Sequence, residues 1–331
     1  MPNMLRFIIR RLFYIVLVLF IVAFFIFWLY RSMPGNPALI FMQGREMDMT
    51  PAEFQEALAR LEAELGLDQP LVVQFFIWVG QVLRGELGYS FQTRMSVMDT
   101  IRLPMLNTIV LSIVNLVLVF AITVPVGIYA AIKRGKLFDN AALVSSMLGF
   151  SAPTFLVGMA FIVIFAVWLQ LLPTGGMASV MAPEFPSFAW LMDRARFAAL
   201  PLMTLVFVST AGLIRFVRSA MVDALHMDFV RTARAKGVKE KAVIYSHAFR
   251  NALIPVITIM TGWFIGIFGG SVVVESVFNW MGMGRLMIQS LMFQDLAILK
   301  ALSVFFSFVS FVGLLLMDIT YVIVDPRIRF D

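Results

Sequence analysis

The sequence has no cysteine, only two histidines and few charged residues. Without cysteine the chain cannot form disulfides, thiolate metal sites or cysteine nucleophiles. With His226 and His247 as the only imidazoles, we expect no histidine-rich metal or haem centre. Charged residues make up 14% of the chain and hydrophobic residues 61%, whereas soluble domains contain about 25% charged and about 45–50% apolar residues. This composition predicts a protein embedded in a lipid bilayer.

The sequence also lacks a phosphate-binding loop of the form G-x-x-x-x-G-K-[ST]. No segment outside the apolar runs is long enough for a nucleotide-binding domain. We therefore expect no catalytic residue, no metal ligand and no cofactor bound by this chain. The formal net charge is +6, and its distribution along the chain indicates membrane topology rather than binding to nucleic acid.

Long uncharged runs dominate the remainder of the sequence. A bilayer core of about 30 Å is crossed by about 20 apolar residues in a helix. We predict an all-α integral membrane protein with six transmembrane helices, at residues 12–30, 103–132, 140–170, 197–214, 251–274 and 301–324. The first run follows three arginines, but it is too long for a signal peptide and no cleavage pattern follows it, so it is expected to be retained.

Basic residues indicate the orientation of these helices, because lysine and arginine are enriched in cytoplasmic loops. They are concentrated near both termini, around residues 133–136 and within 215–250. The prediction is therefore a cytoplasmic N-terminus with the first helix (1–30), followed by an extracytoplasmic segment with amphipathic helices (31–102). A transmembrane core of five helices (103–324) includes a cytoplasmic loop (221–250), and a cytoplasmic tail (325–331) ends the chain.

The long outer segment contains two predicted helices. Thr50 is a candidate N-cap, Pro51 suits the first helical position, and Glu53 completes a capping box, with Gly66 expected at the end of this helix. Residues 71–83 are more apolar but too short to span, so they are expected to lie at the interface or pack on the bundle. The segment is either a structural cap or a docking surface for an external binding protein.

The loop at 221–250 has helix-forming residues on both sides of a single central glycine, Gly237. Apolar residues at 229, 230, 233, 243 and 244 alternate with charges. This pattern predicts two short helices that are broken at Gly237. From composition alone, an ordinary basic loop is the alternative.

Four motifs, in order along the whole chain, resemble those of ABC-importer permeases. FVRTARAKGVKEKAVIYSHAFRNALIP (229–255) is similar to the cytoplasmic loop of the dipeptide/oligopeptide/nickel family, in its first-permease, "B"-type form. LGLDQP (65–70) with GELGYSF (85–91) resembles the family's outer segment, and DITYVIVDPRIR (318–329) resembles its ending. ESVFNWMGMG (275–284) resembles a further stretch, but Met281 stands where proline is usual.

The resemblance implies a type I ABC-importer permease in a bacterial cytoplasmic membrane. Such permeases pair with a second, similar permease, two cytoplasmic ATPase subunits that bind ATP and magnesium, and an extracytoplasmic substrate-binding protein. The cytoplasmic loop would then couple the permease to an ATPase. The coupling residues implied are Asp228, Phe229, Arg231, Thr232, Ala233, Arg234, Ala235, Lys236, Gly237, His247, Arg250 and Asn251.

Further candidate residues lie in or near the last two predicted helices. Gly262, Gly266 and Gly270 form a small-residue ridge, which serves either packing within the bundle or the interface with the partner permease along the pathway. Glu275 is either a gate residue of the translocation pathway or a residue of the outer interface. The structural candidates are Asp318, Asp325 and Arg327.

Di- and oligopeptides are the expected substrates, and nickel or a metal chelate is the alternative within the same family. The two histidines lie in the cytoplasmic loop, which leaves the pathway little with which to hold a metal. An autonomous secondary transporter would show inverted repeats and charges near the bilayer centre, and an intramembrane enzyme would need a nucleophile–base pair or metal ligands at membrane depth. Neither pattern is found in the sequence.

Overall fold

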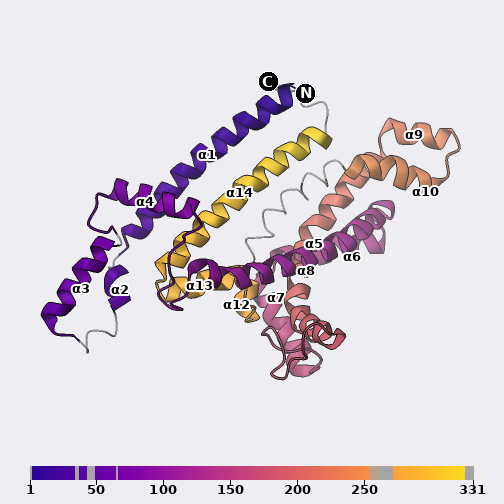
Figure 1. Cartoon of the computed structure of the whole chain (residues 1–331). Coiled ribbons are helices and arrows are strands. Elements are labelled where there is room, and N and C mark those ends of the chain that lie inside the picture. Colours follow the sequence, from indigo (N-terminus) through magenta and orange to yellow (C-terminus); the bar gives the residue numbers. More distant parts are fainter. Residues whose placement is uncertain are drawn as a thin grey trace. The chain divides into compact units, whose positions relative to one another are not determined.

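The computed structural model describes residues 2–33, 37–42, 49–64, 66–253, 256, 259 and 271–324. Within these ranges the ordered elements are helices, and an isolated bridge between Tyr89 and Ser96 is the only extended pairing (Figure 1). The chain forms two compact units, Met1–Leu103 with Leu286–Phe311, and Pro104–Arg285 with Val312–Asp331. The prediction of an all-α integral membrane protein is confirmed by the helical structure and its apolar spans.

The first unit contains long helices and the short helices of the outer segment. Its elements are α1 (Pro2–Arg31), α2 (Pro37–Met42), α3 (Pro51–Glu64), α4 (Leu71–Leu83), α13 (Met283–Met292) from Leu286 onward, and the first parts of α5 (Val97–Ile132) and α14 (Leu296–Val324). The predicted short apolar helix is α4, and it packs on α1. The Phe75 ring lies 5.2 Å from the rings of both Phe20 and Phe24, centroid to centroid. This aromatic cluster holds α4 against the transmembrane helix.

The capping box predicted for α3 is present. Thr50 N donates to Glu53 Oε2 at 2.8 Å, and Glu53 N donates to Thr50 Oγ1 at 3.4 Å. The hydrogen bonds from Thr50 to the carboxylate hold the pKa of Glu53 below its usual value. Gly66 follows the helix with a φ of +64°, as expected of a glycine at a helix end.

A buried carboxylate orders the loop that leads into α5. Asp295 is 1% exposed and accepts a hydrogen bond from Ser90 Oγ at 2.6 Å and one from Gln92 N at 3.3 Å. Its other oxygen accepts from Ile298 N at 3.4 Å and so caps the start of α14. Ser90 belongs to the GELGYSF stretch, so this contact gives that motif a structural role.

The second unit contains the long helix α8 and most of α5. Its other elements are α6 (Leu137–Ser151), α7 (Thr154–Phe161), η1 (Ile162–Trp168), α8 (Phe188–Leu225), α9 (Asp228–Ala235), α10 (Glu240–Ala242), η2 (Val243–Ala248) and α12 (Val272–Val277). The two long helices approach closely at Gly127, where a Cβ atom would lie 2.7 Å from Cγ1 of Val217.

Four described helices are long and apolar enough to span a membrane, namely those at Ile9–Arg31, Val97–Ile132, Phe188–Leu225 and Leu296–Ile319. They correspond to four of the predicted spans. The predicted span at 251–274 lies largely outside the described residues.

The prediction of one continuous helix at 140–170 is wrong. Its residues form a helix pair, Leu137–Ser151 and Thr154–Trp168, bent by 106°. The cause is Pro153, because a proline disfavours helical geometry in the residue before it. Ala152 is extended, with a ψ of 127°, and the helix ends there. The predicted end near Gln170 is close to the observed end at Trp168.

The close approach at Gly127 leads to a stability prediction. In Gly127→Ala the added methyl group overlaps Val217, which we expect to destabilise the protein by about 1–3 kcal/mol. Gly212→Ala is the matched control, because a Cβ at this α8 position meets no atom within 4 Å, and helix propensity predicts a gain of about 0.5–1 kcal/mol. Thermal unfolding of the purified protein in detergent measures both. Equal melting temperatures for the two variants would contradict the packing described here.

Candidate functional site

The cytoplasmic loop predicted at 221–250 begins later than expected, because Met221–Leu225 continue α8. The predicted coupling residues lie in residues 228–251, hereafter the coupling segment. It contains α9, α10 and η2, and α9 packs against η2 (Figure 1). The predicted break between two short helices at Gly237 is confirmed, since α9 ends at Ala235 and α10 begins at Glu240.

The reversal at Gly237 has a defined hydrogen-bond pattern. Gly237 N donates to Arg234 O at 3.0 Å, and Val238 N donates to Ala233 O at 3.2 Å. These two bonds form a Schellman motif, which requires a left-handed residue after the helix. Gly237 supplies it with a φ of +76°. Any other residue would be strained at this position, so the glycine fixes the direction in which the chain leaves α9.

One face of the coupling segment is buried against α8. Val230 of α9 and Val243 and Ala248 of η2 are fully buried, and Ala233 is 6% exposed. They share a cluster with side chains of α8 such as Met221, which is also fully buried. The segment is therefore attached to α8 by an apolar contact as well as by the chain itself.

The opposite face of α9 is exposed and carries most of the predicted coupling residues. Phe229 lies there with 37% of its surface exposed, an unusual position for a large apolar side chain beside arginine and lysine. The exposed predicted residues of this helix and its C-cap are Asp228, Phe229, Arg231, Thr232, Arg234, Ala235 and Lys236. Ala233 is the exception among the predicted residues of α9, because it faces the core.

Charges on this face are paired within the segment. Arg234 Nη2 lies 2.7 Å from Glu240 Oε1, and its Nε donates to Glu240 Oε2 at 3.2 Å. This bidentate pair spans the Gly237 turn, and hydrogen bonding from Arg234 holds the pKa of Glu240 below its usual value. Arg231 Nη1 is 3.7 Å from Asp228 Oδ1, a weaker contact.

Of the remaining predicted coupling residues, His247 lies in the last turn of η2, and Arg250 and Asn251 follow this helix. His247, Arg250 and Asn251 are exposed, and Asn251 Nδ2 donates to the His247 carbonyl oxygen at 2.8 Å. The structure thus gives the coupling segment two adjoining exposed groups of residues, one on α9 and one at the end of η2.

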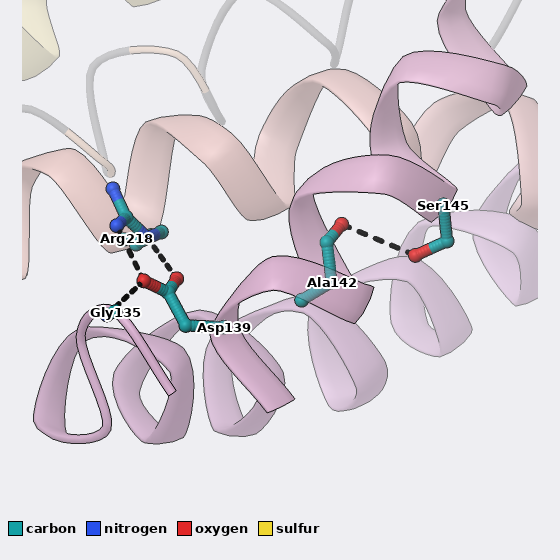
Figure 2. A network of polar contacts seen from close by, with 5 residues as sticks. All are labelled: Gly135, Asp139, Ala142, Ser145 and Arg218. Atoms are coloured by element: carbon teal, nitrogen blue, oxygen red, sulfur yellow. Dashed lines mark hydrogen bonds and ion pairs between the residues drawn. The ribbon is translucent and has the colours of Figure 1, made fainter. Parts of the chain in front are cut away.

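A buried ion pair that the sequence did not reveal lies beside the base of this segment. Figure 2 shows Arg218 of α8 directed at Asp139 of α6. Arg218 Nη2 donates to Asp139 Oδ2 at 2.7 Å, its Nε donates to Oδ1, and Gly135 N donates to Oδ2 at 2.8 Å. Asp139 is 1% exposed. The pair fixes α6 to α8 three residues before Met221, which packs against the coupling segment.

Glu275 is fully buried and organises the ESVFNWMGMG stretch around its carboxylate. Its Oε1 accepts from Thr108 Oγ1 at 2.9 Å, and its Oε2 accepts from Arg285 N at 3.0 Å. Gly282 and Gly284 approach so closely that a Cβ atom at either would lie within 3 Å of a neighbouring atom. The glutamate and both glycines of this motif therefore serve the fold of the stretch, and a role for Glu275 in the pathway stays a prediction.

Other predicted residues are less informative. Asp318 is partly buried on α14. Gly262, Gly266, Gly270, Asp325 and Arg327 lie outside the described residues. Among the residues that the structure does describe, no three histidine, aspartate or glutamate side chains gather into a group that could hold a metal ion.

Comparison with known proteins gives matches over the whole chain. Residues 123–330 match the model of the binding-protein-dependent transport system inner membrane component, and residues 4–112 match the model of the N-terminal part of such a membrane component. The oligopeptide transport system permease protein AppB of Bacillus subtilis is 35% identical over 330 residues, which cover 99% of this chain and 100% of AppB. The glutathione transport system permease protein GsiC of Escherichia coli K12 is 36% identical over 327 residues, with coverage of 99% and 100%. GsiC of Salmonella typhi has the same identity and coverage.

The Asp139–Arg218 pair predicts a specific pattern of stabilities. Arg218→Met leaves Asp139 buried and unpaired, which we expect to destabilise the protein by about 3–5 kcal/mol. Arg215→Met, at an exposed position of the same helix, is the matched control and should change stability by less than about 1 kcal/mol.

The double variant Asp139→Leu/Arg218→Met should recover most of the loss, because it leaves no buried charge without a partner. The melting temperatures of the natural protein, the two single variants and the double variant are compared by thermal unfolding in detergent. If Arg218→Met melts at the same temperature as Arg215→Met, the pair does not hold α6 to α8.

Proposed function

The chain belongs to the family of inner membrane components of binding-protein-dependent transport systems, and on that premise we propose that it lines the translocation pathway of an ATP-driven importer for peptides. It is a multi-pass permease subunit rather than an ATPase. A transport system of this kind includes ATPase and binding-protein partners. The observation that carries the proposal is the end-to-end similarity to permeases whose names specify oligopeptide and glutathione transport.

The proposed assembly contains this chain, a second homologous permease, two cytoplasmic ATPase subunits and an extracytoplasmic substrate-binding protein. ATP and magnesium bind to the ATPase subunits and not to this chain. Six transmembrane helices in the type I arrangement place both termini in the cytoplasm and the segment at 31–102 outside. The distribution of lysine and arginine supports this orientation.

The first step of the proposed mechanism is docking of α9 on an ATPase subunit. Phe229 is an exposed apolar side chain, and Arg231 and Lys236 are exposed cations of the same helix and its C-cap. An aromatic side chain with flanking cations is suited to a groove with an apolar floor and an acidic rim. The intramolecular Arg234–Glu240 pair keeps the docking face in one conformation.

The second step is transmission of the ATPase movement to the bundle. The apolar contact between the coupling segment and Met221 of α8 means that displacement of α9 also displaces α8. The Asp139–Arg218 pair extends this connection to α6. Nucleotide binding then biases the bundle between an inward-open and an outward-open state.

Peptides are favoured over nickel as the substrate. The relatives are named for oligopeptide and for glutathione, which is itself a short peptide. Of the two histidines of the chain, His226 lies just before the coupling segment and His247 lies within it, on the side proposed to face the cytoplasm.

The coupling role is tested by straining the turn at Gly237. Gly237→Val places a β-branched residue at a φ of +76°, where non-glycine residues are disfavoured by about 1–2 kcal/mol. We expect peptide uptake to fall by about tenfold while ATP hydrolysis by the complex continues, since tenfold corresponds to about 1.4 kcal/mol, which lies within this range.

The matched control is Gly85→Val in the outer segment, where φ is +80° and a Cβ atom also meets nothing within 4 Å. This variant carries the same backbone strain and should transport peptide normally. Uptake and ATPase activity are measured in proteoliposomes that contain the whole complex. Equal uptake by the two variants would argue against the coupling role.

A further inference from the structure

The first unit contains a cavity of about 210 Å³ with an unusual lining. It lies between α1, α4, the loop before α5 and the first turns of α14. Aromatic side chains form much of its wall, among them Phe27, Tyr30 and Trp78, and two cations, Arg31 and Lys300, also line it. A single water needs about 10–15 Å³ of such space, so the cavity has room for several waters or for a phosphate group.

Neither cation has a carboxylate partner among the described residues. Arg31 donates from Nε to Gln74 Oε1 at 3.1 Å and from Nη2 to Leu67 O at 3.5 Å, so its acceptors are neutral. Lys300 Nζ lies 5.7 Å from the centre of the Phe27 ring, and no hydrogen bond or ion pair joins it to any residue that the structure describes.

The electrostatics of the cavity favour an anion. Glu64 is the one carboxylate among the described residues that line it, and this exposed residue makes no ion pair with either cation. Two partly buried like charges with aromatic walls are unfavourable unless a negative group lies between them. The cavity therefore presents two donors of positive charge and leaves the matching anion to a ligand.

The position of the cavity relative to the membrane identifies the source of that anion. Arg31 is the last residue of the apolar span Ile9–Arg31, and Lys300 lies about one turn inside the span Leu296–Ile319. The ends of transmembrane helices lie at the level of lipid headgroups, where tyrosine, tryptophan and basic residues are enriched. This holds for either orientation of the chain, so it does not depend on the proposed topology.

An apolar surface adjoins the cavity. α4 forms part of its wall and is too short to span a membrane, and it exposes Val72 and Phe76, which are 54% and 58% exposed. Such a surface at headgroup level is suited to contact with acyl chains. A free phosphate ion would make no use of it.

We propose that this cavity binds the phosphate of an anionic phospholipid, with Arg31 and Lys300 as its charged ligands and the acyl chains over the exposed face of α4. The ligand joins α1, α4 and α14, three helices that contribute to the cavity wall. Bound lipid would thus stabilise the first unit, and a zwitterionic lipid would do so less well because the ammonium group of its headgroup offsets the phosphate charge that compensates the two cations.

The experiment uses the whole purified complex after delipidation, titrated with short-chain phosphatidylglycerol, short-chain phosphatidylcholine or inorganic phosphate. Thermal unfolding of this subunit is the readout, and native mass spectrometry counts the retained lipids. We expect phosphatidylglycerol to raise the melting temperature of the natural protein, and its half-maximal concentration to increase at least about tenfold in Lys300→Met, a loss of 1.4 kcal/mol.

Two further variants make the outcome decisive. Arg31→Gln should also raise the half-maximal concentration of phosphatidylglycerol. This variant tests the proposal independently if Lys300→Met does not fold. Arg84→Gln, at an exposed arginine of the same outer segment that does not line the cavity, should respond as the natural protein does. The proposal is overturned if Lys300→Met and Arg31→Gln both respond normally, if phosphatidylcholine acts as well as phosphatidylglycerol, or if inorganic phosphate alone reproduces the effect. Since transport is not measured, failure here leaves the importer assignment unaffected.

Discussion

Apolar side chains of α9 and η2 are buried against the C-terminal part of α8, and the proposed function depends on this contact. Burial of a side chain such as Val230 or Val243 stabilises a protein by about 1.5–3 kcal/mol, so the cluster as a whole holds the coupling segment firmly to the bundle. In the proposed mechanism, movement of an ATPase partner reaches the permease through this connection. The exposed face of α9 remains available to a partner because the buried face already satisfies the hydrophobic residues of the segment.

Two buried carboxylates stiffen the bundle through different interactions. Asp139 is neutralised by Arg218 and joins two helices near the base of the coupling segment. Glu275 instead accepts hydrogen bonds from Thr108 Oγ1 and Arg285 N and orders the loop after α12. In the cavity beside Arg31 and Lys300 the positive charges have no carboxylate partner among the described residues, and the proposed lipid would supply the compensating charge. The charges of Asp139 and Glu275 thus serve the fold, whereas those of Arg31 and Lys300 are proposed to bind a ligand.

Local sequence patterns were sufficient for most of the fold. The capping box at Thr50, the short helix α4 and the turn at Gly237 were all predictable because each depends on residues close together in sequence. The bend at Pro153 was not, since hydropathy shows only an uncharged run, and Pro125 lies within α5 without ending it. The contacts of Asp139 with Arg218 and of Glu275 with Thr108 join residues 79 and 167 positions apart. Such pairs leave no periodic signal in one sequence. The exposed coupling residues of α9 were therefore predicted, whereas the Asp139–Arg218 pair beside the coupling segment was not.

Since the natural chain contains no cysteine, single cysteines can be introduced without background reactions. Phe229→Cys on the exposed face of α9 and Leu83→Cys, 82% exposed in the outer segment, can be compared in the assembled complex with a short thiol-to-amine cross-linker. We predict that Phe229→Cys joins this chain to an ATPase subunit and that Leu83→Cys does not. Cross-linking of the ATPase from Leu83→Cys but not from Phe229→Cys would contradict the proposal that α9 is the coupling contact.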